Sequence, residues 1–349
     1  MDAQIRDINL ANPDEFEEWK NFLESLGIAN FSGAEVDPLD GTIGLFEGDK
    51  LVGTGSYSEN ILKYIGVCHK DTSNGVYFNK VVSSLLTRLG QLGVFHVFVF
   101  TKPQYSKSFQ HVGFSEIVQS ENAAFLETGN HNIKDYLAEI PHLAGDDISA
   151  IVMNANPFTL GHRYLVEAAA KRSKHVYVFV VSTDKSLFNS KERLELVKEG
   201  TKDLENVEVV SGGDYLVSYA TFPSYFLKSD KSKVVYQTTI DALVFKEWIA
   251  KNLNIKTRFL GTEPESKTTD VYNEVLRDVL PPEVKVEVIP RKENGSGDII
   301  SARTVRLAIK NDNISSIRNI VPTSTYDFIE NHLGELQDRI KKGMKIDGN

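Results

Sequence analysis

The segment from Ile148 to Arg172 constrains the fold of this chain more than any other. It begins with a short apolar run, Ile148 to Met153, and continues through the loop Asn154-Ala-Asn-Pro-Phe-Thr-Leu-Gly-His162. It ends in a stretch of strong helix formers, Arg163 to Arg172. This order predicts a buried strand, a tight loop and a helix. That unit builds α/β folds, in which ligands bind at the carboxyl ends of the strands.

The same alternation of strand and helix continues beyond residue 172. It predicts a doubly wound, mostly parallel, Rossmann-like sheet with helices on both faces. We expect strands over residues 148–153, 175–182, 207–210, 233–236, 257–260 and 285–289, and helices over 161–172, 190–204, 222–227, 240–253 and 269–280.

The region before residue 130 mixes helices and strands without this regularity, which predicts an α+β domain. The turn Glu47-Gly-Asp-Lys50 predicts a hairpin between two strand-like runs. The polar stretch 130–144 is expected to be a linker. We expect helices over 15–26 and 76–92, a short helix ending at His111, and strands over 42–46, 51–58, 61–67, 94–100, 114–118 and 123–127.

Length and composition bound the architecture and the partners. A chain of 349 residues exceeds one average domain, so we expect two, over 1–145 and 146–349. The net charge of -9 argues against general binding of nucleic acid, although ATP can still be held by local groups. No apolar run is long enough to span a membrane. The single cysteine excludes an intramolecular disulfide and suits a reducing compartment, so we expect a cytoplasmic protein.

The loop from Asn154 to His162 has the features of a phosphate site. The helix that follows directs backbone N–H groups and a positive dipole end at the loop. Gly161 permits close approach of backbone or ligand, and His162 can donate a ring N–H to a phosphate oxygen. The alternative is that the proline, glycine and histidine serve only the turn.

The order Asn-Pro-x-Thr-x-Gly-His resembles the signature of the HxGH nucleotidylyltransferase superfamily, with Thr159 where many members have their first histidine. A later segment, Ile300-Ser-Ala-Arg-Thr-Val-Arg306, resembles the superfamily's Ile-Ser-x-x-x-x-Arg motif. The resemblance implies ATP as substrate, with Mg²⁺ bridging its phosphates and no metal site built from the protein alone. It implies catalytic roles for His162 and Thr159, and phosphate contacts for Asn154, Asn156, Gly161, Ser301, Arg303 and Arg306. In a doubly wound sheet the loop after the second strand lies beside the first motif, so we also expect a catalytic role for Lys185, within reach of a substrate carboxylate or the α-phosphate.

Several other residues follow predicted strands and face the same edge of the sheet. Phe188, Glu192 and Arg193 form an arrangement that recurs in the superfamily, but helix capping and a surface salt bridge explain the last two equally well. The adenosine or acceptor pocket is expected to include Asp241, Gly261, Glu263 and Arg291.

The N-terminal order of elements, with the phrase Phe109-Gln-His-Val-Gly-Phe-Ser-Glu-Ile117, resembles N-acetyltransferases of the GNAT type. In that family a glycine-rich turn cradles the pyrophosphate of coenzyme A. The matching stretch here, His69 to Val76, keeps one glycine of that turn. The resemblance therefore implies either an acetyltransferase or a module that only binds or docks.

Three phrases behind this GNAT-like region resemble the citrate lyase ligase family: Asn154 to Leu165, Phe259-Leu-Gly-Thr-Glu-Pro264 and Ile289-Pro-Arg-Lys-Glu293. The resemblance implies that acetate attacks ATP to give acetyl-AMP and pyrophosphate. The acetyl group then passes to the thiol of the phosphoribosyl-dephospho-coenzyme A arm on the acyl carrier subunit of citrate lyase. The N-terminal region would recognise that arm or assist the transfer.

Two other functions remain open from the sequence. One is a nucleotidylyltransferase that adenylylates a phosphorylated small molecule, such as pantetheine phosphate or nicotinamide mononucleotide. The other is a non-catalytic adaptor that binds a nucleotide or an acyl carrier. A dinucleotide product would identify the first, and ATP binding without release of pyrophosphate would identify the second.

Overall fold

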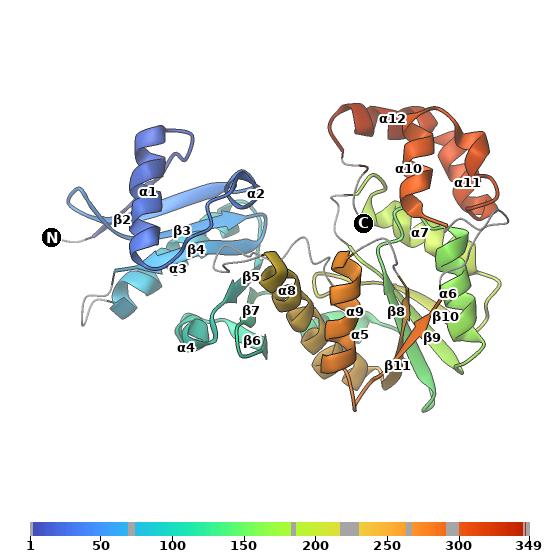
Figure 1. Ribbon diagram of the computed structural model, residues 1–349. Helices are drawn as coiled ribbons and strands as arrows, with labels where there is room; N and C mark the ends of the chain where they lie inside the picture. The colour runs from blue at the N-terminus through green and yellow to red at the C-terminus, as the bar shows by residue number, and fades with distance from the viewer. Residues whose placement is uncertain are drawn as a thin grey trace. The chain divides into compact units, whose positions relative to one another are not determined.

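The computed structural model describes residues 3–68, 74–182, 186–216, 230–262, 267–290, 300–344 and 346 (Figure 1). The chain divides into two compact units. The N-terminal unit comprises Met1–Tyr136 with Phe222–Ile240, and the C-terminal unit comprises Leu137–Thr221 with Asp241–Asn349. Among the described helices, none has the length and apolar character that crossing a bilayer requires.

The N-terminal unit is built on a seven-stranded sheet in the order β1-β2-β3-β4-β5-β7-β6. All neighbours are antiparallel except β4 and β5, which are parallel and share only the pairs Ile61↔Phe98 and Leu62↔Val99. The strands are β1 (Gln4–Asp7), β2 (Gly41–Glu47), β3 (Lys50–Ser58), β4 (Ile61–Val67), β5 (His96–Thr101), β6 (Ser115–Gln119) and β7 (Ala124–Gly129).

The helices of this unit confirm the predicted apolar periodicity. In α3, Val81, Val82, Leu85 and Leu89 are buried and share one cluster with residues of the sheet. The linker prediction is partly wrong, because Ile133–Glu139 forms α5 and buries three apolar side chains spaced for a helix face. The helices that precede α5 are α1 (Pro13–Ser25), α2 (Gly33–Val36), α3 (Asn74–Gln91) and α4 (Pro103–His111).

The C-terminal unit confirms the doubly wound parallel sheet. Its five strands lie in the order β10-β9-β8-β11-β12, and every pair is parallel. The chain fills one side of β8 first and then the other, so the strand order reverses between β8 and β11. The strands are β8 (Ile148–Met153), β9 (His175–Val180), β10 (Val207–Ser211), β11 (Ile255–Gly261) and β12 (Lys285–Ile289).

One expected strand is wrong. Residues 233–236 lie in α8 (Asp230–Val244), which continues as the π-helical segment η2 (Phe245–Ala250). Tyr236, Ile240 and Val244 are all buried at a spacing of four, which is the period of a helix rather than a strand. The helix expected over 222–227 lies outside the described residues.

Some of the remaining helices cover the parallel sheet, and α10, α11 and α12 form a C-terminal helical group (Figure 1). The remaining helices are α6 (Leu160–Ala170), α7 (Ser190–Thr201), α9 (Lys267–Val279), α10 (Ala302–Lys310), the 3₁₀ turn η3 (Ile314–Ile317), α11 (Thr323–Asn331) and α12 (Leu333–Lys341).

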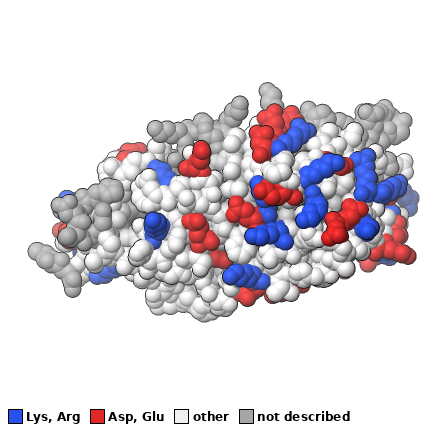
Figure 2. All heavy atoms as spheres, turned by 90° about the horizontal axis from the view of Figure 1, so that it is seen from below, with Lys and Arg blue, Asp and Glu red and all other residues white. Residues whose placement is uncertain are grey.

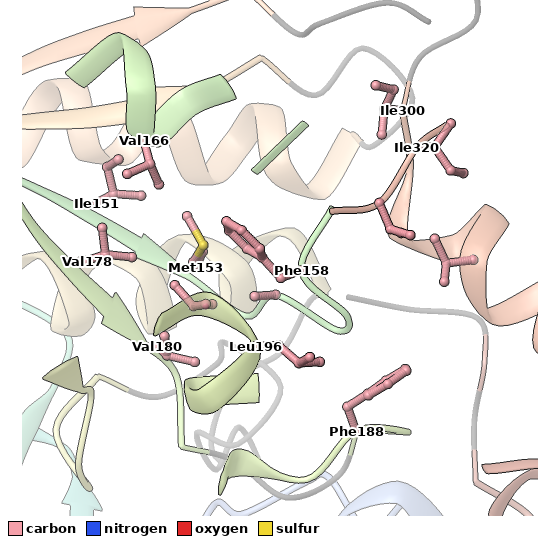
Figure 3. Close-up of a cluster of buried hydrophobic side chains, with 14 of the residues drawn as sticks. Ile151, Met153, Phe158, Val166, Val178, Val180, Phe188, Leu196, Ile300 and Ile320 are labelled. Carbon is pink, nitrogen blue, oxygen red and sulfur yellow. The ribbon is translucent and has the colours of Figure 1, made fainter. Parts of the chain in front are cut away.

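An apolar cluster joins one face of this sheet to the C-terminal helices (Figure 3). Phe158, from the loop after β8, is completely buried and lies beside Met153. Ile300 and Ile320 approach the same loop from the C-terminal segment. Gly200 of α7 leaves room for Phe158, because a Cβ there would lie 2.5 Å from its ring. Burial of a phenylalanine stabilises the fold by about 1.5–3 kcal/mol, and here it also fixes the loop.

The surface shown in Figure 2 carries both signs of charge. Lysine and arginine side chains are intermingled with aspartate and glutamate on this face, and among the described residues there no extended stripe of one sign forms.

Candidate functional site

The loop of the first motif lies at the topological switch point of the parallel sheet. It leaves β8 after Met153, next to the place where the strand order reverses, and enters α6 at Leu160. Crevices at this position are where doubly wound sheets bind ligands. The N-terminus of α6, with its positive dipole end, lies at this edge of the sheet. Of its backbone N–H groups, that of Leu160 donates to the backbone oxygen of Ile320 at 2.9 Å.

A capping box formed by Thr159 and His162 begins α6. The backbone N–H of Thr159 donates to Nδ1 of His162 at 3.1 Å, and Thr159 Oγ1 lies 2.9 Å from the same nitrogen. In return, Thr159 Oγ1 accepts a weaker hydrogen bond from the backbone N–H of His162 at 3.4 Å. The imidazole also stacks against Phe158, with ring planes 18° apart. The first motif thus fixes the orientation of its own histidine.

The two asparagines of the motif use their side chains to connect the loops after β8 and β9. Asn156 is buried, and its Oδ1 accepts a hydrogen bond from the backbone N–H of Phe188 at 3.1 Å. Asn154 Nδ2 donates to Ser186 Oγ at 3.4 Å. Between them, Ala155 has a φ of 50°, a left-handed conformation that is uncommon for alanine. The loop holds this conformation because both its neighbours are tied down.

Arg193 of α7 completes this connection, and sequence reasoning missed its role. Its side chain is fully buried, which excludes the surface salt bridge, one of the two alternatives that the sequence left open for it. The guanidinium donates to the backbone oxygens of Asn154, Val181 and Phe188, at 2.9, 2.6 and 3.0 Å, and to Oδ1 of Asn154 at 2.6 Å. A planar guanidinium has five donors in a fixed fork, which suits several oxygens from two loops. The only sequence signal for this role was the arrangement of Phe188, Glu192 and Arg193, which resembles one in the superfamily.

The neighbouring Glu192 caps its own helix and binds the C-terminal helical group. The N-cap of α7 is Asn189, and Asn189 and Glu192 form a reciprocal capping box. Glu192 also accepts hydrogen bonds from Nη1 and Nη2 of Arg339, both at 2.7 Å. Nη1 of Arg339 donates as well to the backbone oxygen of Leu187, at 3.1 Å. The hydrogen bonds to Glu192 and Glu335 raise the pKa of Arg339, although burial opposes the rise.

The third motif approaches the first at the N-terminus of α10. Ser301 is the N-cap, and its Oγ accepts a hydrogen bond from the backbone N–H of Arg303 at 3.2 Å. A Cβ on Gly161 would lie 3.3 Å from the backbone oxygen of Ile300, so the glycine allows a close approach of α6 to this segment. The N-termini of α6 and α10 therefore lie close together at this edge of the sheet, and both present a positive dipole end.

Arg306 is buried behind this meeting point. Its Nη1 donates to the backbone oxygen of Asn156, and its Nε donates to the backbone oxygen of Ile346 at 2.9 Å. The arginine thus ties the third motif to the first and to the end of the chain. Its phosphate contact stays a prediction, as does that of Arg303, whose side chain is exposed.

Asp241 lies in a different cluster from the first motif. Tyr272 donates to its Oδ2 at 2.9 Å, and the fully buried Arg258 lies 3.8 Å away and donates to the Tyr272 oxygen at 2.8 Å. Burial raises the pKa of Asp241, although Arg258 and the Tyr272 hydroxyl oppose the rise. Gly261 ends β11 at the edge of the sheet that carries the first motif, and its oxygen accepts a hydrogen bond from Asn273 at 3.4 Å.

Other predicted site residues lie outside the described part of the chain. These are Lys185, Glu263 and Arg291, together with residues 69–73 of the predicted coenzyme A turn. Within the described residues, no three His, Cys, Asp or Glu side chains are grouped to hold a metal ion. The paired helix N-termini fit ATP, because backbone N–H groups and positive dipole ends complement its phosphates.

The N-terminal unit has a cavity of about 460 Å³ where β4 and β5 separate. Apolar residues from both strands line it, among them Ile65, Val67 and Val99. Its basic lining residues are Lys102, Lys107 and His111, and among the described residues no acidic side chain lines it. The cavity therefore suits an anionic ligand with an apolar or amide-containing chain.

Comparison with known proteins identifies relatives over most of the chain. Residues 148–329 match the citrate lyase ligase C-terminal domain family. The citrate (pro-3S)-lyase ligase of Haemophilus influenzae is 35% identical over 82% of this chain and 88% of its own length. That of Klebsiella pneumoniae is 35% identical over 80% of this chain and 84% of its own. Among solved structures, an N-acyl amino acid synthase from uncultured soil microbes matches 39% of this chain and 94% of its own, with 14% identity and a TM-score of 0.31.

Proposed function

Because this chain belongs to the citrate lyase ligase family, we propose that it adenylates acetate with ATP and then acetylates the thiol of the citrate lyase acyl carrier. That acetylation activates citrate lyase. The observation that carries the proposal is the meeting of the α6 and α10 N-termini at the switch point of the sheet. A thiol acceptor needs a reducing compartment, so we place the reaction in the cytoplasm.

In the first step an acetate oxygen attacks the α-phosphorus of ATP. The bond from the α-phosphorus to the bridging oxygen breaks, and pyrophosphate leaves with the electron pair. Catalysis of such a step consists mainly of positioning and charge stabilisation. His162 donates a hydrogen bond to the α-phosphoryl oxygens, and the N–H groups at Ser301 hold the β- and γ-phosphates. Mg²⁺, when bound to the phosphates, neutralises part of their charge.

In the second step the carrier thiolate attacks the acetyl carbon of acetyl-AMP. The bond between that carbon and the phosphate oxygen breaks, and AMP leaves. An acyl adenylate is a mixed anhydride with a good leaving group, so the protein supplies mainly orientation. This step distinguishes the ligase from a nucleotidylyltransferase with a phosphorylated acceptor, an alternative that the relatives do not favour.

The decisive measurement is acetate-dependent exchange of labelled pyrophosphate into ATP, with Mg²⁺ present. We expect exchange in the parent protein and a loss of at least about a hundredfold in His162→Ala, because removal of a single electrostatic donor has that scale of effect. Exchange that needs a phosphorylated acceptor instead of acetate would overturn the ligase proposal. ATP binding without any exchange would favour the adaptor.

We further propose that the cavity between β4 and β5 receives the coenzyme A-like arm of the carrier. Its lining supports this, because the arm combines an amide-containing chain with phosphates. Charge reversal at Lys102 and Lys107 should raise the KM for the acyl carrier and leave acetate-dependent pyrophosphate exchange unchanged. Lys50→Glu, on an exposed hairpin of the same unit and outside the cavity lining, is the matched control. An unchanged KM in the double variant would refute this role.

A further inference from the structure

We infer that the first motif holds His162 as the neutral imidazole with its proton on Nε2. The histidine then acts on the α-phosphate as a directed hydrogen-bond donor and not as an imidazolium cation. Thr159 is its positioning residue and acts through the histidine rather than on ATP. The inference about the phosphate rests on the proposed function, whereas the protonation state follows from the capping box alone.

The backbone N–H of Thr159 is the group in the capping box whose hydrogen-bonding role is fixed. A backbone N–H can only donate, and that of Thr159 donates to Nδ1 of His162 at 3.1 Å. An accepting Nδ1 carries no proton, so in a neutral ring the proton is on Nε2. The hydroxyl of Thr159, 2.9 Å from Nδ1, adapts to this arrangement because it can rotate.

Burial of Thr159 excludes the other hydrogen-bonding arrangements of the imidazole ring. Thr159 is 1% exposed, so its backbone N–H cannot exchange the imidazole for water. A flip of the ring by 180° would replace Nδ1 with a carbon and leave that N–H buried without an acceptor, which proteins avoid. Protonation of Nδ1 would place two donors against each other. Phe158, stacked on the ring at a centroid distance of 5.9 Å, restricts its other orientations.

This arrangement gives a physical role to Thr159, which stands where many members of the superfamily have their first histidine. Thr159 supplies the N-cap that α6 needs and an extended backbone, with φ of -117°, that directs its N–H at the imidazole. The Nε2–H then has a direction set by the main chain and not by a mobile side chain. Preorganised donors of this kind stabilise developing charge without reorganisation during the reaction.

The first test is the protonation state itself, read from long-range ¹H–¹⁵N correlation spectra of the full chain with ¹⁵N-labelled histidine. His162→Gln assigns the signal. We expect a protonated Nε2 and an unprotonated Nδ1 at the pH of full activity, in the parent and in Thr159→Val, which keeps the backbone N–H. A proton on Nδ1 in the parent would overturn the inference. Loss of the Nε2–H state in Thr159→Val would overturn the assignment to the backbone.

The second test compares two amides in pyrophosphate exchange. Glutamine at position 162 places an amide N–H near the position of Nε2 and is a good residue for the third position of a helix. Asparagine instead places its amide near Nδ1 and offers no donor at Nε2. We expect His162→Gln to keep at least about tenfold more exchange than His162→Asn, a difference of about 1.4 kcal/mol. Equal losses in two folded variants would overturn the donor role, whereas absence of exchange in the parent would refute only the proposed function.

Discussion

At the scale of single residues, arginine shows most clearly how context decides a role. Arg193 and Arg306 are both buried, and both donate to backbone oxygens of the loop after β8. In the sequence they appear as a surface charge and as a phosphate ligand. A guanidinium is weakly hydrated for a cation and has several fixed donors, so it can be buried where carbonyl oxygens converge. The loop after β8 is therefore supported from behind by buried arginine side chains.

Arg193→Lys should show the importance of this support. A lysine keeps the charge but cannot reach the oxygens of Asn154, Val181 and Phe188 together. We expect the free energy of unfolding to fall by about 2–4 kcal/mol, because hydrogen bonds to charged groups contribute about 1.5–3 kcal/mol each. The kcat/KM for ATP should fall at least about tenfold as the loops lose their register. Urea unfolding and pyrophosphate exchange measure the two effects.

Arg172→Lys is the matched control for this substitution. Arg172 belongs to the same unit, but its side chain is 55% exposed and pairs with Glu287 at 3.2 Å. An exposed pair contributes little, so both measurements should stay close to those of the parent. A similar response of the two variants would contradict the support by Arg193.

At the scale of elements, helix N-termini serve both stability and binding. Ser301 caps α10 through the backbone N–H of Arg303, and the same N-terminus lies beside the first motif. A cap and a phosphate site use the same free N–H groups. The sequence pattern alone cannot separate these functions, because serine before a helix is favoured in both.

Two substitutions at Ser301 should separate them. Ser301→Ala removes the cap, and we expect it to lower the free energy of unfolding by about 1 kcal/mol. Ser301→Asp keeps a good cap but places a negative charge against the phosphates, so stability should be retained while the KM for ATP rises more than in Ser301→Ala. Thermal unfolding and ATP-dependent exchange provide the comparison. If Ser301→Asp binds ATP as well as the parent does, the phosphates are bound elsewhere.

At the scale of the whole molecule, the candidate site of the C-terminal unit depends on connections between distant parts of the sequence. In the C-terminal unit, Arg339 of α12 joins Glu192 of α7, and Arg306 of α10 joins Asn156 of the first motif. Ile300 and Ile320 add apolar contacts, because they pack in the same cluster as Phe158 of the loop after β8 (Figure 3). The C-terminal helices therefore belong to the framework of the site.

Arg339→Met should test this framework. The variant keeps the apolar stem but loses both hydrogen bonds to Glu192 and the one to the Leu187 oxygen. We expect a loss of about 2–3 kcal/mol in the free energy of unfolding, since these are charge-assisted bonds of half-buried groups. The KM for ATP should rise as well. Lys341→Met, whose partner Asp338 lies on the same exposed face of α12, should change neither value.

Much of this protein was determined by its sequence. Apolar periodicity predicted the parallel sheet and most helices, because burial of apolar faces is encoded locally and repeats with the period of each element. The first motif predicted a loop at the end of β8, since glycine, proline and a capping residue constrain the backbone directly. The third motif could be matched to it only through resemblance, because residues so far apart in the chain have no local relation.

Tertiary structure decided the roles of the polar residues. Tyr236 belongs to a helix although its neighbours favour a strand, because burial every fourth residue outweighs local propensity. Arg193 is internal because four oxygens from two loops converge on it, and Nδ1 of His162 accepts because the Thr159 N–H is buried against it. A polar group can be satisfied in several ways that the sequence alone does not distinguish. The choice is made when packing excludes water and leaves one set of partners within reach.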